Sequence, residues 1–178
     1  MENINLRKAT LADISHLQQI GRQTFYETFA TSNSEQNMKT YLEEGFSLKR
    51  LTTELQNPDS AFYFAEFGHA IIGYLKVNTG ASQTELQEEC ALEIERIYVL
   101  QAYHGQKVGQ LLYEQALQLA REAQADYVWL GVWEENPHAI RFYQKNGFVE
   151  FDRHIFTLGD DEQTDIMMRL HLSGTQSS

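Results

Sequence analysis

Apolar and polar residues near the start of the chain follow the periods of one short strand and then of helices. Residues 4–8 alternate as a strand does. Thr10 can cap a helix, and Asp13 three residues later completes a capping-box pattern before apolar residues at helical spacing. Three successive helices are therefore expected, over residues 10–29, 35–44 and 47–56. The tripeptide Asn57-Pro58-Asp59 is a turn signal that ends this helical part.

The second part of the chain is richer in strands. Two apolar runs meet at Gly68 and predict a β-hairpin, followed by a polar loop over residues 78–89. A strand, a helix with one apolar stripe and an almost wholly apolar strand come next, over residues 91–100, 105–124 and 127–133. Asn136-Pro137 opens another helix and Asn146-Gly147 ends it. A final antiparallel pair is expected over residues 148–158 and 165–172, joined by the acidic loop GDDEQT.

This order predicts an α/β fold with one mixed sheet. The strand–helix–strand unit over residues 91–133 should cross over right-handedly, which makes its two strands parallel. The other pairs are antiparallel neighbours, so the sheet is mostly antiparallel, with helices on both faces. Residues 1–172 form a single domain in this interpretation, and the polar tail 173–178 is expected to be disordered.

Composition narrows the class of protein. The chain has 178 residues of which 42% are hydrophobic, which is typical of a globular domain, and no apolar run is long enough to cross a bilayer. The first residues do not resemble a secretion signal, and the single cysteine, Cys90, excludes an internal disulfide, so a cytoplasmic protein is expected. A net charge of −11 argues against binding to nucleic acid.

The acidic residues are concentrated in two segments. Five lie in residues 85–95 and four in residues 160–165. This placement fits either a cationic ligand or a merely solvated acidic surface, and the sequence leaves both open.

The turn between the strand at 91–100 and the following helix contains two glycines, Gly105 and Gly109. It is neither a Walker loop nor a dinucleotide fingerprint. An anion at the helix N-terminus would explain it, and so would close packing of the helix on the strand.

The surroundings of this turn carry a family resemblance. Ile97-Tyr98-Val99 precedes it, NPHAIRFYQKNGF follows the next strand, and the chain opens with INLRKATLADISHL. Together these segments resemble the GNAT superfamily of acetyltransferases over nearly the whole chain. The segments TFYETFATSN and FTLGDDEQTDIMM are similar to PaiA-type polyamine acetyltransferases.

The resemblance implies that the two parallel strands splay apart and that acetyl-CoA enters between them. The backbone of Ile97, Tyr98 and Val99 would pair with the pantetheine arm. The pyrophosphate would be bound by the turn and the first N–H groups of the helix, where the dipole favours an anion. The residues concerned are His104, Gly105, Gln106, Lys107, Val108, Gly109 and Gln110. His104 and Lys107 depart from the family pattern, but backbone donation is expected to survive because Lys107 would need only helical dihedrals.

Acetyl transfer to an amine needs a proton donor for the leaving thiolate. Tyr143 matches the family tyrosine that is placed for this role, and it lies seven residues after Asn136, on the same helix face. The alternative for Tyr143 is a core aromatic. Asn136 would cap its helix and bind the pantetheine, with capping alone as the alternative.

The general base is predicted among strand glutamates. Simple alternation puts Glu93 and Glu95 on one face with Ile97 and Val99, and Arg96 and Tyr98 on the other. Glu95 matches the water-linked glutamate of related polyamine enzymes and is the preferred base, whereas Glu93 matches the position used by other members. Binding of a cationic substrate is the alternative role for Glu95.

The resemblance implies that the acceptor site lies between the first helices and the loop before the last strand. Phe25 and Tyr26 would contact the substrate, and Asp160, Asp161 and Asp165 would attract ammonium groups, unless they only form a solvated loop. Cys90 has no basic neighbours in sequence and is not favoured as an acetyl carrier. No metal ion is implied.

The leading hypothesis is therefore an acetyl-CoA-dependent N-acetyltransferase that moves the acetyl group directly to a primary amine of a small molecule, with a polyamine as the best candidate. A protein lysine or N-terminal acetyltransferase is the alternative, and a non-catalytic acyl-CoA-binding module is the second. The oligomeric state is left open, a homodimer being one option.

Overall fold

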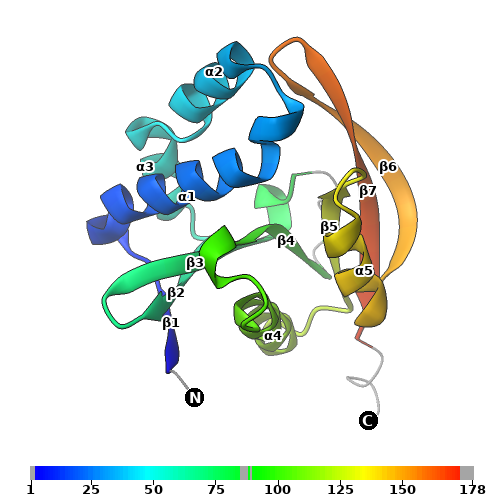
Figure 1. Ribbon diagram of the computed structural model, residues 1–178. Coiled ribbons are helices and arrows are strands. Elements are labelled where there is room, and N and C mark those ends of the chain that lie inside the picture. Colours follow the sequence, from blue (N-terminus) through cyan, green and yellow to red (C-terminus); the bar gives the residue numbers. More distant parts are fainter. Residues whose placement is uncertain (1–2, 85–87, 89, 173–178) are drawn as a thin grey trace.

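The computed structural model describes residues 3–84, 88 and 90–172. A seven-stranded sheet in the order β1-β2-β3-β4-β5-β7-β6 separates two groups of helices, α1 to α3 on one face and α4 with α5 on the other (Figure 1). The strands are β1 (Ile4–Lys8), β2 (Ser60–Phe67), β3 (Ala70–Thr79), β4 (Ala91–Val99), β5 (Tyr127–Trp133), β6 (Val149–Leu158) and β7 (Asp161–His171). The helices are α1 (Ile14–Phe29), α2 (Glu35–Gly45), α3 (Leu48–Gln56), α4 (Val108–Glu122) and α5 (Pro137–Lys145).

Local capping accounts for where most helices begin. The predicted capping box between Thr10 and Asp13 is present, and a short 3-10 turn precedes α1. Ser34 and Ser47 cap α2 and α3, each accepting a backbone N–H bond of 3.1 Å. Polar side chains thus satisfy N–H groups that have no partner within the helix.

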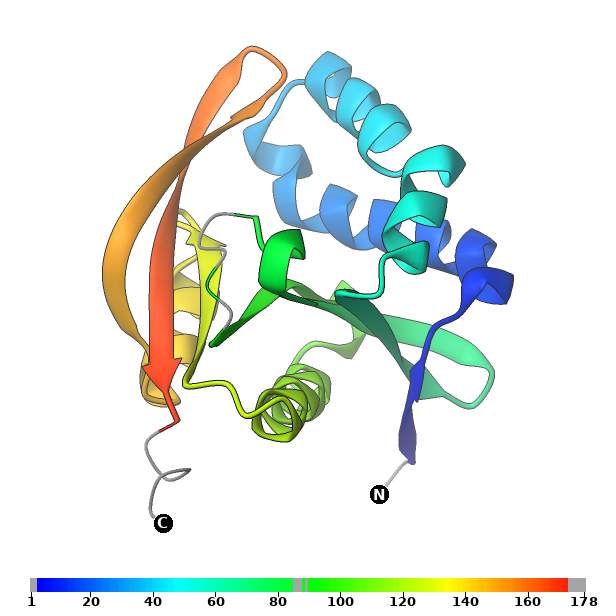
Figure 2. The same cartoon turned by 180° about the vertical axis from the view of Figure 1, so that it is seen from behind.

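The predicted mixed sheet is confirmed. Among the described strands, only β4 and β5 run parallel, and their pairing is limited to Ala91–Ile94 against Tyr127–Leu130. Every other described strand pair is antiparallel. One hydrophobic core lies under α4 and includes Leu75, Val128 and Met168, and a second lies under α1 to α3. Figure 2 shows from behind how the long β6–β7 hairpin curves away from the rest of the sheet and approaches α2 at its tip.

Two predicted boundaries are wrong. The segment GDDEQT is not a loop, because β7 already begins at Asp161 and the chain turns at Gly159, whose φ is +66°. Helix α4 begins at Val108 rather than at Gly105. The predicted disordered tail, residues 173–178, lies outside the described residues. No helix in the described ranges is long and apolar enough to span a membrane.

Candidate active site

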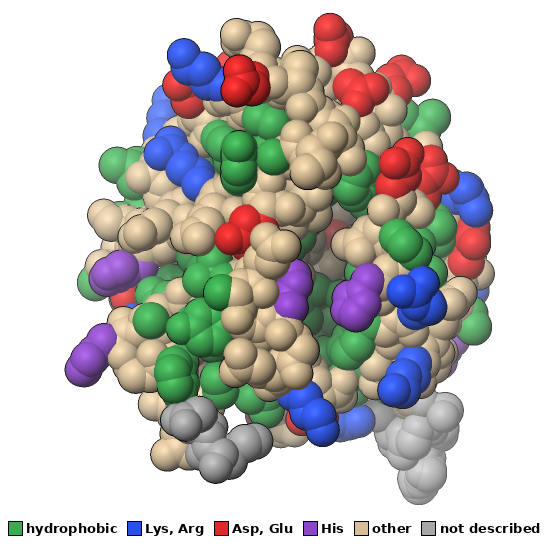
Figure 3. Space-filling model, in the orientation of Figure 1, with side chains coloured by type: hydrophobic (Ala, Val, Ile, Leu, Met, Phe, Trp, Pro, Cys, Tyr) green, Lys and Arg blue, Asp and Glu red, His purple; other side chains and the backbone are tan. Residues whose placement is uncertain are grey.

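A cavity of about 290 Å³ opens where β4 and β5 separate. Their last paired residues are Ile94 and Leu130, and beyond them β4 pairs only with β3, and β5 only with β7. Side chains from α1, β4, β5, α5, β6 and β7 line the cavity. The space-filling view shows the molecule hollowed between α4 and α5, with histidine side chains at the edges of the hollow (Figure 3). The splay predicted from the family resemblance is present.

A β-bulge at Glu95 changes which β4 side chains face the cavity. Arg96 pairs with Lys76, but Ile94 pairs with Val77, so Glu95 is the extra residue. The alternation is therefore reversed beyond it: Ile94, Ile97 and Val99 all belong to the core under α4, while Tyr98 packs on the side of α1 to α3. The predicted grouping of Glu93 and Glu95 with Ile97 and Val99 is wrong, because one extra residue at the bulge exchanges the two faces of the sheet for the β4 residues that follow it.

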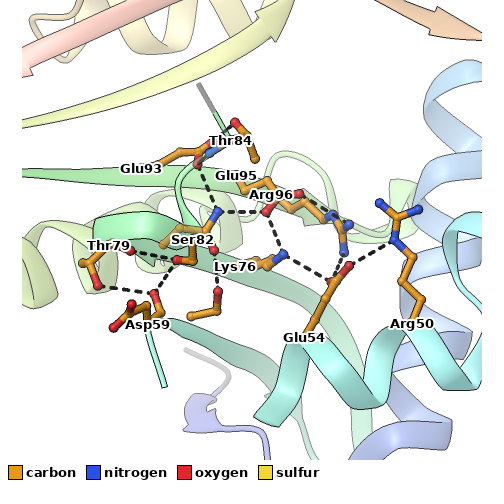
Figure 4. A network of polar contacts seen from close by, with 12 residues as sticks. Arg50, Glu54, Asp59, Lys76, Thr79, Ser82, Thr84, Glu93, Glu95 and Arg96 are labelled. Carbon is orange, nitrogen blue, oxygen red and sulfur yellow. Dashed lines mark hydrogen bonds and ion pairs between the residues drawn. The ribbon is translucent and has the colours of Figure 1, made fainter. Parts of the chain in front are cut away.

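On the α3 side of the bulge, buried and half-buried charges form one network that reaches the surface (Figure 4). Glu54 of α3 contacts Lys76 at 3.2 Å and Arg96 at 3.5 Å. Lys76 also lies 2.7 Å from Glu95. Arg50 extends the network to the surface through a contact of 3.3 Å with Glu54. The carboxylate charge of Glu95 is therefore balanced within the protein.

These contacts set the pKa of Glu95. Burial raises it, but the charges of Arg96 and Lys76, with a hydrogen bond from Asn78, outweigh burial and lower the pKa to about 2. Glu95 is thus ionised throughout the physiological range, and it is restrained by cations on two sides.

Glu93 lies in a different environment. Its side chain is 3% exposed, and burial raises its pKa against the hydrogen bonds that favour its charged form. Oε1 accepts bonds from the Thr84 amide at 2.8 Å and from Asn78 at 3.0 Å, and Oε2 accepts one from the Thr84 hydroxyl at 2.5 Å. Because Asn78 donates to both glutamates, it couples their positions.

Helix α5 brings the predicted acid and its partner to the other wall of the cavity. Asn136 caps α5 by accepting the Ala139 N–H at 3.2 Å, and both Asn136 and Tyr143 line the cavity. The Tyr143 ring packs edge-on against Phe142 and Phe148, and burial raises the pKa of its hydroxyl. Tyr143 is therefore a core aromatic and a cavity residue at once.

The turn before α4 differs from its prediction in one respect. Lys107, which caps α4, has left-handed dihedrals, φ +66° and ψ +20°, rather than helical ones. A non-glycine residue is strained there. The first backbone bond of α4 is donated by Leu111 to the Lys107 carbonyl, so the amides of Val108, Gly109 and Gln110 precede it. These donors and the exposed residues 104–107 form a helix N-terminus suited to an anion.

His104 lies next to a predicted cofactor contact. Its Nε2 is 2.8 Å from the Val99 carbonyl oxygen, one of the backbone groups expected to pair with pantetheine. The contact requires the tautomer with hydrogen on Nε2. The imidazole and the pantetheine arm would therefore compete for this carbonyl.

The acetyltransferase (GNAT) family matches residues 22–148. The chain belongs to this family. This GNAT acetyltransferase is 36% identical over 169 residues to an uncharacterized N-acetyltransferase in the pepI 3' region of Lactobacillus delbrueckii subsp. lactis, covering 95% of this chain and 98% of the relative. It is accordingly an acyltransferase.

One match in sequence and one in structure, both from Thermoplasma acidophilum, are also similar. The spermidine N(1)-acetyltransferase is 26% identical over 150 residues, covering 82% of this chain and 88% of the relative. The crystal structure of PaiA N-acetyltransferase in complex with coenzyme A superposes with a TM-score of 0.78 at 24% identity, covering 95% and 99% of the two chains. The structural likeness supports the fold.

In this GNAT acetyltransferase, the predicted acceptor residues separate into two groups. Phe25 is buried, stacks on Tyr41 with ring centroids 4.2 Å apart, and lines the cavity. Tyr26 is 55% exposed and faces a separate surface groove. Asp160 accepts a hydrogen bond from Asn37 of α2, Asp161 accepts one from Gln163, and neither lines the cavity.

The cavity also contains groups that the sequence did not single out. Arg50, His154 and Trp133 line it, as does Tyr74, whose buried hydroxyl has no hydrogen-bond partner in the described structure. Nothing local in the sequence distinguishes these residues, because they come from α3, β3, β5 and β6, which meet only in the tertiary structure. Asp165, expected near a loop, instead lies within β7 and reaches the cavity.

Proposed function

We propose that this GNAT acetyltransferase transfers the acetyl group of acetyl-CoA directly to a primary amine of a small molecule. The observation that carries the proposal is the cavity between β4 and β5, which has Tyr143 on one wall and three carboxylates, Glu93, Glu95 and Asp165, on the others. A proton donor and negative charge thus face the same space, as transfer to a cationic amine requires.

The residues present fit the cofactor. The amides at the start of α4 suit the pyrophosphate, since a helix N-terminus combines unpaired donors with a favourable dipole. Beyond Ile94, the edge of β4 that faces β5 has no strand partner in the described structure, which leaves the backbone of Ile97, Tyr98 and Val99 for the pantetheine arm. Asn136 lines the same gap. When bound, acetyl-CoA supplies an activated acyl carbonyl with a thiolate leaving group.

The chain's own residues then have two roles to fill. Tyr143 is the proposed general acid for the departing sulfur, because it lies on α5 and its side chain lines the gap. Glu95 stays the predicted water-linked base and Glu93 the alternative. The ion pairs of Glu95 favour a second contribution, a fixed negative charge that attracts the acceptor ammonium.

A polyamine is the proposed acceptor class. Of the charged groups that line the cavity, the two guanidinium groups, Arg50 and Arg96, are already paired with Glu54, whereas Asp165 is not ion-paired to a described residue. The excess of acid favours a cationic acceptor. The similarity to a spermidine N(1)-acetyltransferase supports the same class.

Two measurements test the proposal. Calorimetric titration with acetyl-CoA should give saturable binding, and thiol release should then be followed with spermidine, spermine, amino acids and lysine-containing peptides. Polyamines are expected to give the highest kcat/KM. Faster transfer to peptides would favour the protein acetyltransferase alternative, and binding without thiol release in any reaction would favour the non-catalytic module.

A further inference from the structure

Asp165 occupies a distinctive position in the cavity. It pairs with Trp133 of β5 on one side and with His154 of β6 on the other, and both Asp165 and His154 line the cavity. Its carboxylate lies over Gly131: a Cβ built on that glycine would be 3.2 Å from the Asp165 Oδ2 atom. Gly131 directly follows Leu130, the last β5 residue paired with β4. The Asp165 carboxylate therefore stands where the two strands part.

Gly131 makes room for this carboxylate. It is the one exposed residue of β5, whose other six residues are buried. Any side chain at position 131 would project from the strand toward the space that Asp165 occupies. A glycine at this position thus keeps the mouth of the gap open and leaves the carboxylate facing it.

The three carboxylates of the cavity differ in their freedom to take a proton. Glu95 is held by Lys76 and Arg96, and both oxygens of Glu93 accept hydrogen bonds. No hydrogen bond or ion pair to another described residue restrains the Asp165 carboxylate. Burial raises its pKa to about 6, with the charge of His154 acting in the opposite direction. A base with a pKa near the working pH is the most effective proton acceptor.

Resting on the proposed acetyl transfer, we propose that Asp165, rather than Glu95 or Glu93, is the catalytic residue that receives the acceptor ammonium and removes its proton. The carboxylate takes one proton from R–NH₃⁺ and becomes a carboxylic acid, leaving a neutral amine with a free electron pair. That pair forms the C–N bond as the C–S bond breaks. The sulfur receives a proton from Tyr143, the amide nitrogen returns one to Tyr143, and Asp165 releases its proton to solvent, so that atoms and charge balance.

The test compares Asp165→Asn with Asp152→Asn, using the amine of the panel that gives the fastest thiol release. Asp152 lies in the same hairpin but is exposed and does not line the cavity. Asp165→Asn should lower kcat by roughly a hundredfold, the usual scale for a positioned base. The acidic limb of the kcat/KM profile near pH 6 should disappear, while acetyl-CoA affinity by calorimetry is unchanged. Asp152→Asn should match the wild type.

A second variant keeps the proposal testable if Asp165→Asn fails to fold. Gly131→Ala keeps the charge but places a methyl group 3.2 Å from Oδ2, so kcat should fall while circular dichroism stays native. A raised KM with an unchanged kcat and an intact acidic limb in Asp165→Asn would overturn the inference and make Asp165 a binding residue only. If the wild type transfers acetyl to no amine, the proposed function itself fails, which is a different result from full activity in Asp165→Asn.

Discussion

At the scale of single residues, environment separates groups of the same chemistry. Glu93, Glu95 and Asp165 are all carboxylates of one cavity. Paired cations lower the pKa of Glu95 to about 2, whereas burial without such pairing raises the pKa of Glu93 and raises that of Asp165 to about 6. The division follows from one rule: a partner of opposite charge favours the ionised form, and desolvation opposes it.

Tyr143 offers the most direct test of the proposed general acid. Tyr143→Phe removes only the hydroxyl and keeps the ring between Phe142 and Phe148, so packing should be retained. We expect kcat to fall roughly a hundredfold with acetyl-CoA affinity preserved. Steady-state kinetics and calorimetry measure the two quantities. An unaltered kcat would assign Tyr143 to the core alone.

Asp165 should also make stability depend on pH. Its pKa in the folded state, about 6, lies above the usual 3.8, so between these values the folded chain binds more protons than the unfolded one. Stability therefore falls as pH rises through this window. Asp165→Asn should melt at a higher temperature than the wild type at pH 8, and the difference should shrink toward pH 4. Thermal melts across this range would contradict the argument if the variant melted lower at pH 8.

At the scale of elements, both ends of α4 use left-handed non-glycine residues. Lys107 precedes the helix with a φ of +66°, and Gln124 follows it with a φ of +58°. Glycine adopts this conformation without the steric cost that a side chain incurs. Variants at these two positions can therefore distinguish the effect of backbone strain on stability from an effect on cofactor binding.

The matched variants are Lys107→Gly and Gln124→Gly. Each should stabilise the protein by roughly 1 kcal/mol, because each relieves a left-handed side chain. Only Lys107→Gly should weaken acetyl-CoA binding, by several-fold and mostly at low salt, because it removes a charge near the expected pyrophosphate. Denaturant unfolding and calorimetry give the two readouts. Equal loss of affinity in both variants would show that the Lys107 charge has no part in binding.

At the scale of the whole molecule, the β6–β7 hairpin reaches across to α2. The Asn37 amide donates to Asp160 at 2.9 Å, and a Cβ on Gly159 would lie 2.1 Å from Asn37 Oδ1. The tip therefore contacts α2 closely, and the hairpin carries His154, Phe156 and Asp165 into the cavity. The acidic residues at the tip, Asp160 and Asp161, therefore shape the end of the hairpin and do not line the cavity.

Asn37→Ala should loosen this contact without unfolding the protein. Loss of one exposed hydrogen bond costs about 1 kcal/mol, so the melting temperature should change little. Hydrogen exchange at the hairpin tip should quicken and KM for the amine should rise, while acetyl-CoA affinity stays the same. Gln36→Ala is the control, because the side-chain hydrogen bond of Gln36 in the described part of the chain lies within α2, to Thr40. If hydrogen exchange at the tip is unchanged in Asn37→Ala, the hydrogen bond between Asn37 and Asp160 is not what restrains the tip.

The sequence by itself determined the kind and order of nearly every helix and strand, and the segments on which the proposed cofactor turn, Asn136 and Tyr143 lie. Periodicity, caps and turn residues act over a few neighbours, so they can be read locally. Position along one helix likewise predicted that Asn136 and Tyr143 share one face, and both line the cavity.

Only the tertiary structure decided how the site is assembled. The bulge at Glu95 depends on how β3 and β4 register, and it alone puts Glu95, Lys76 and Arg96 in one network. Asp160 and Asp161 extend the hairpin rather than a loop, while Asp165 reaches the gap because β7 lies beside β5. Such contacts join residues far apart in the chain, and no short turn fixes the register of β4 on β3, since β3 ends at Thr79 and β4 begins at Ala91.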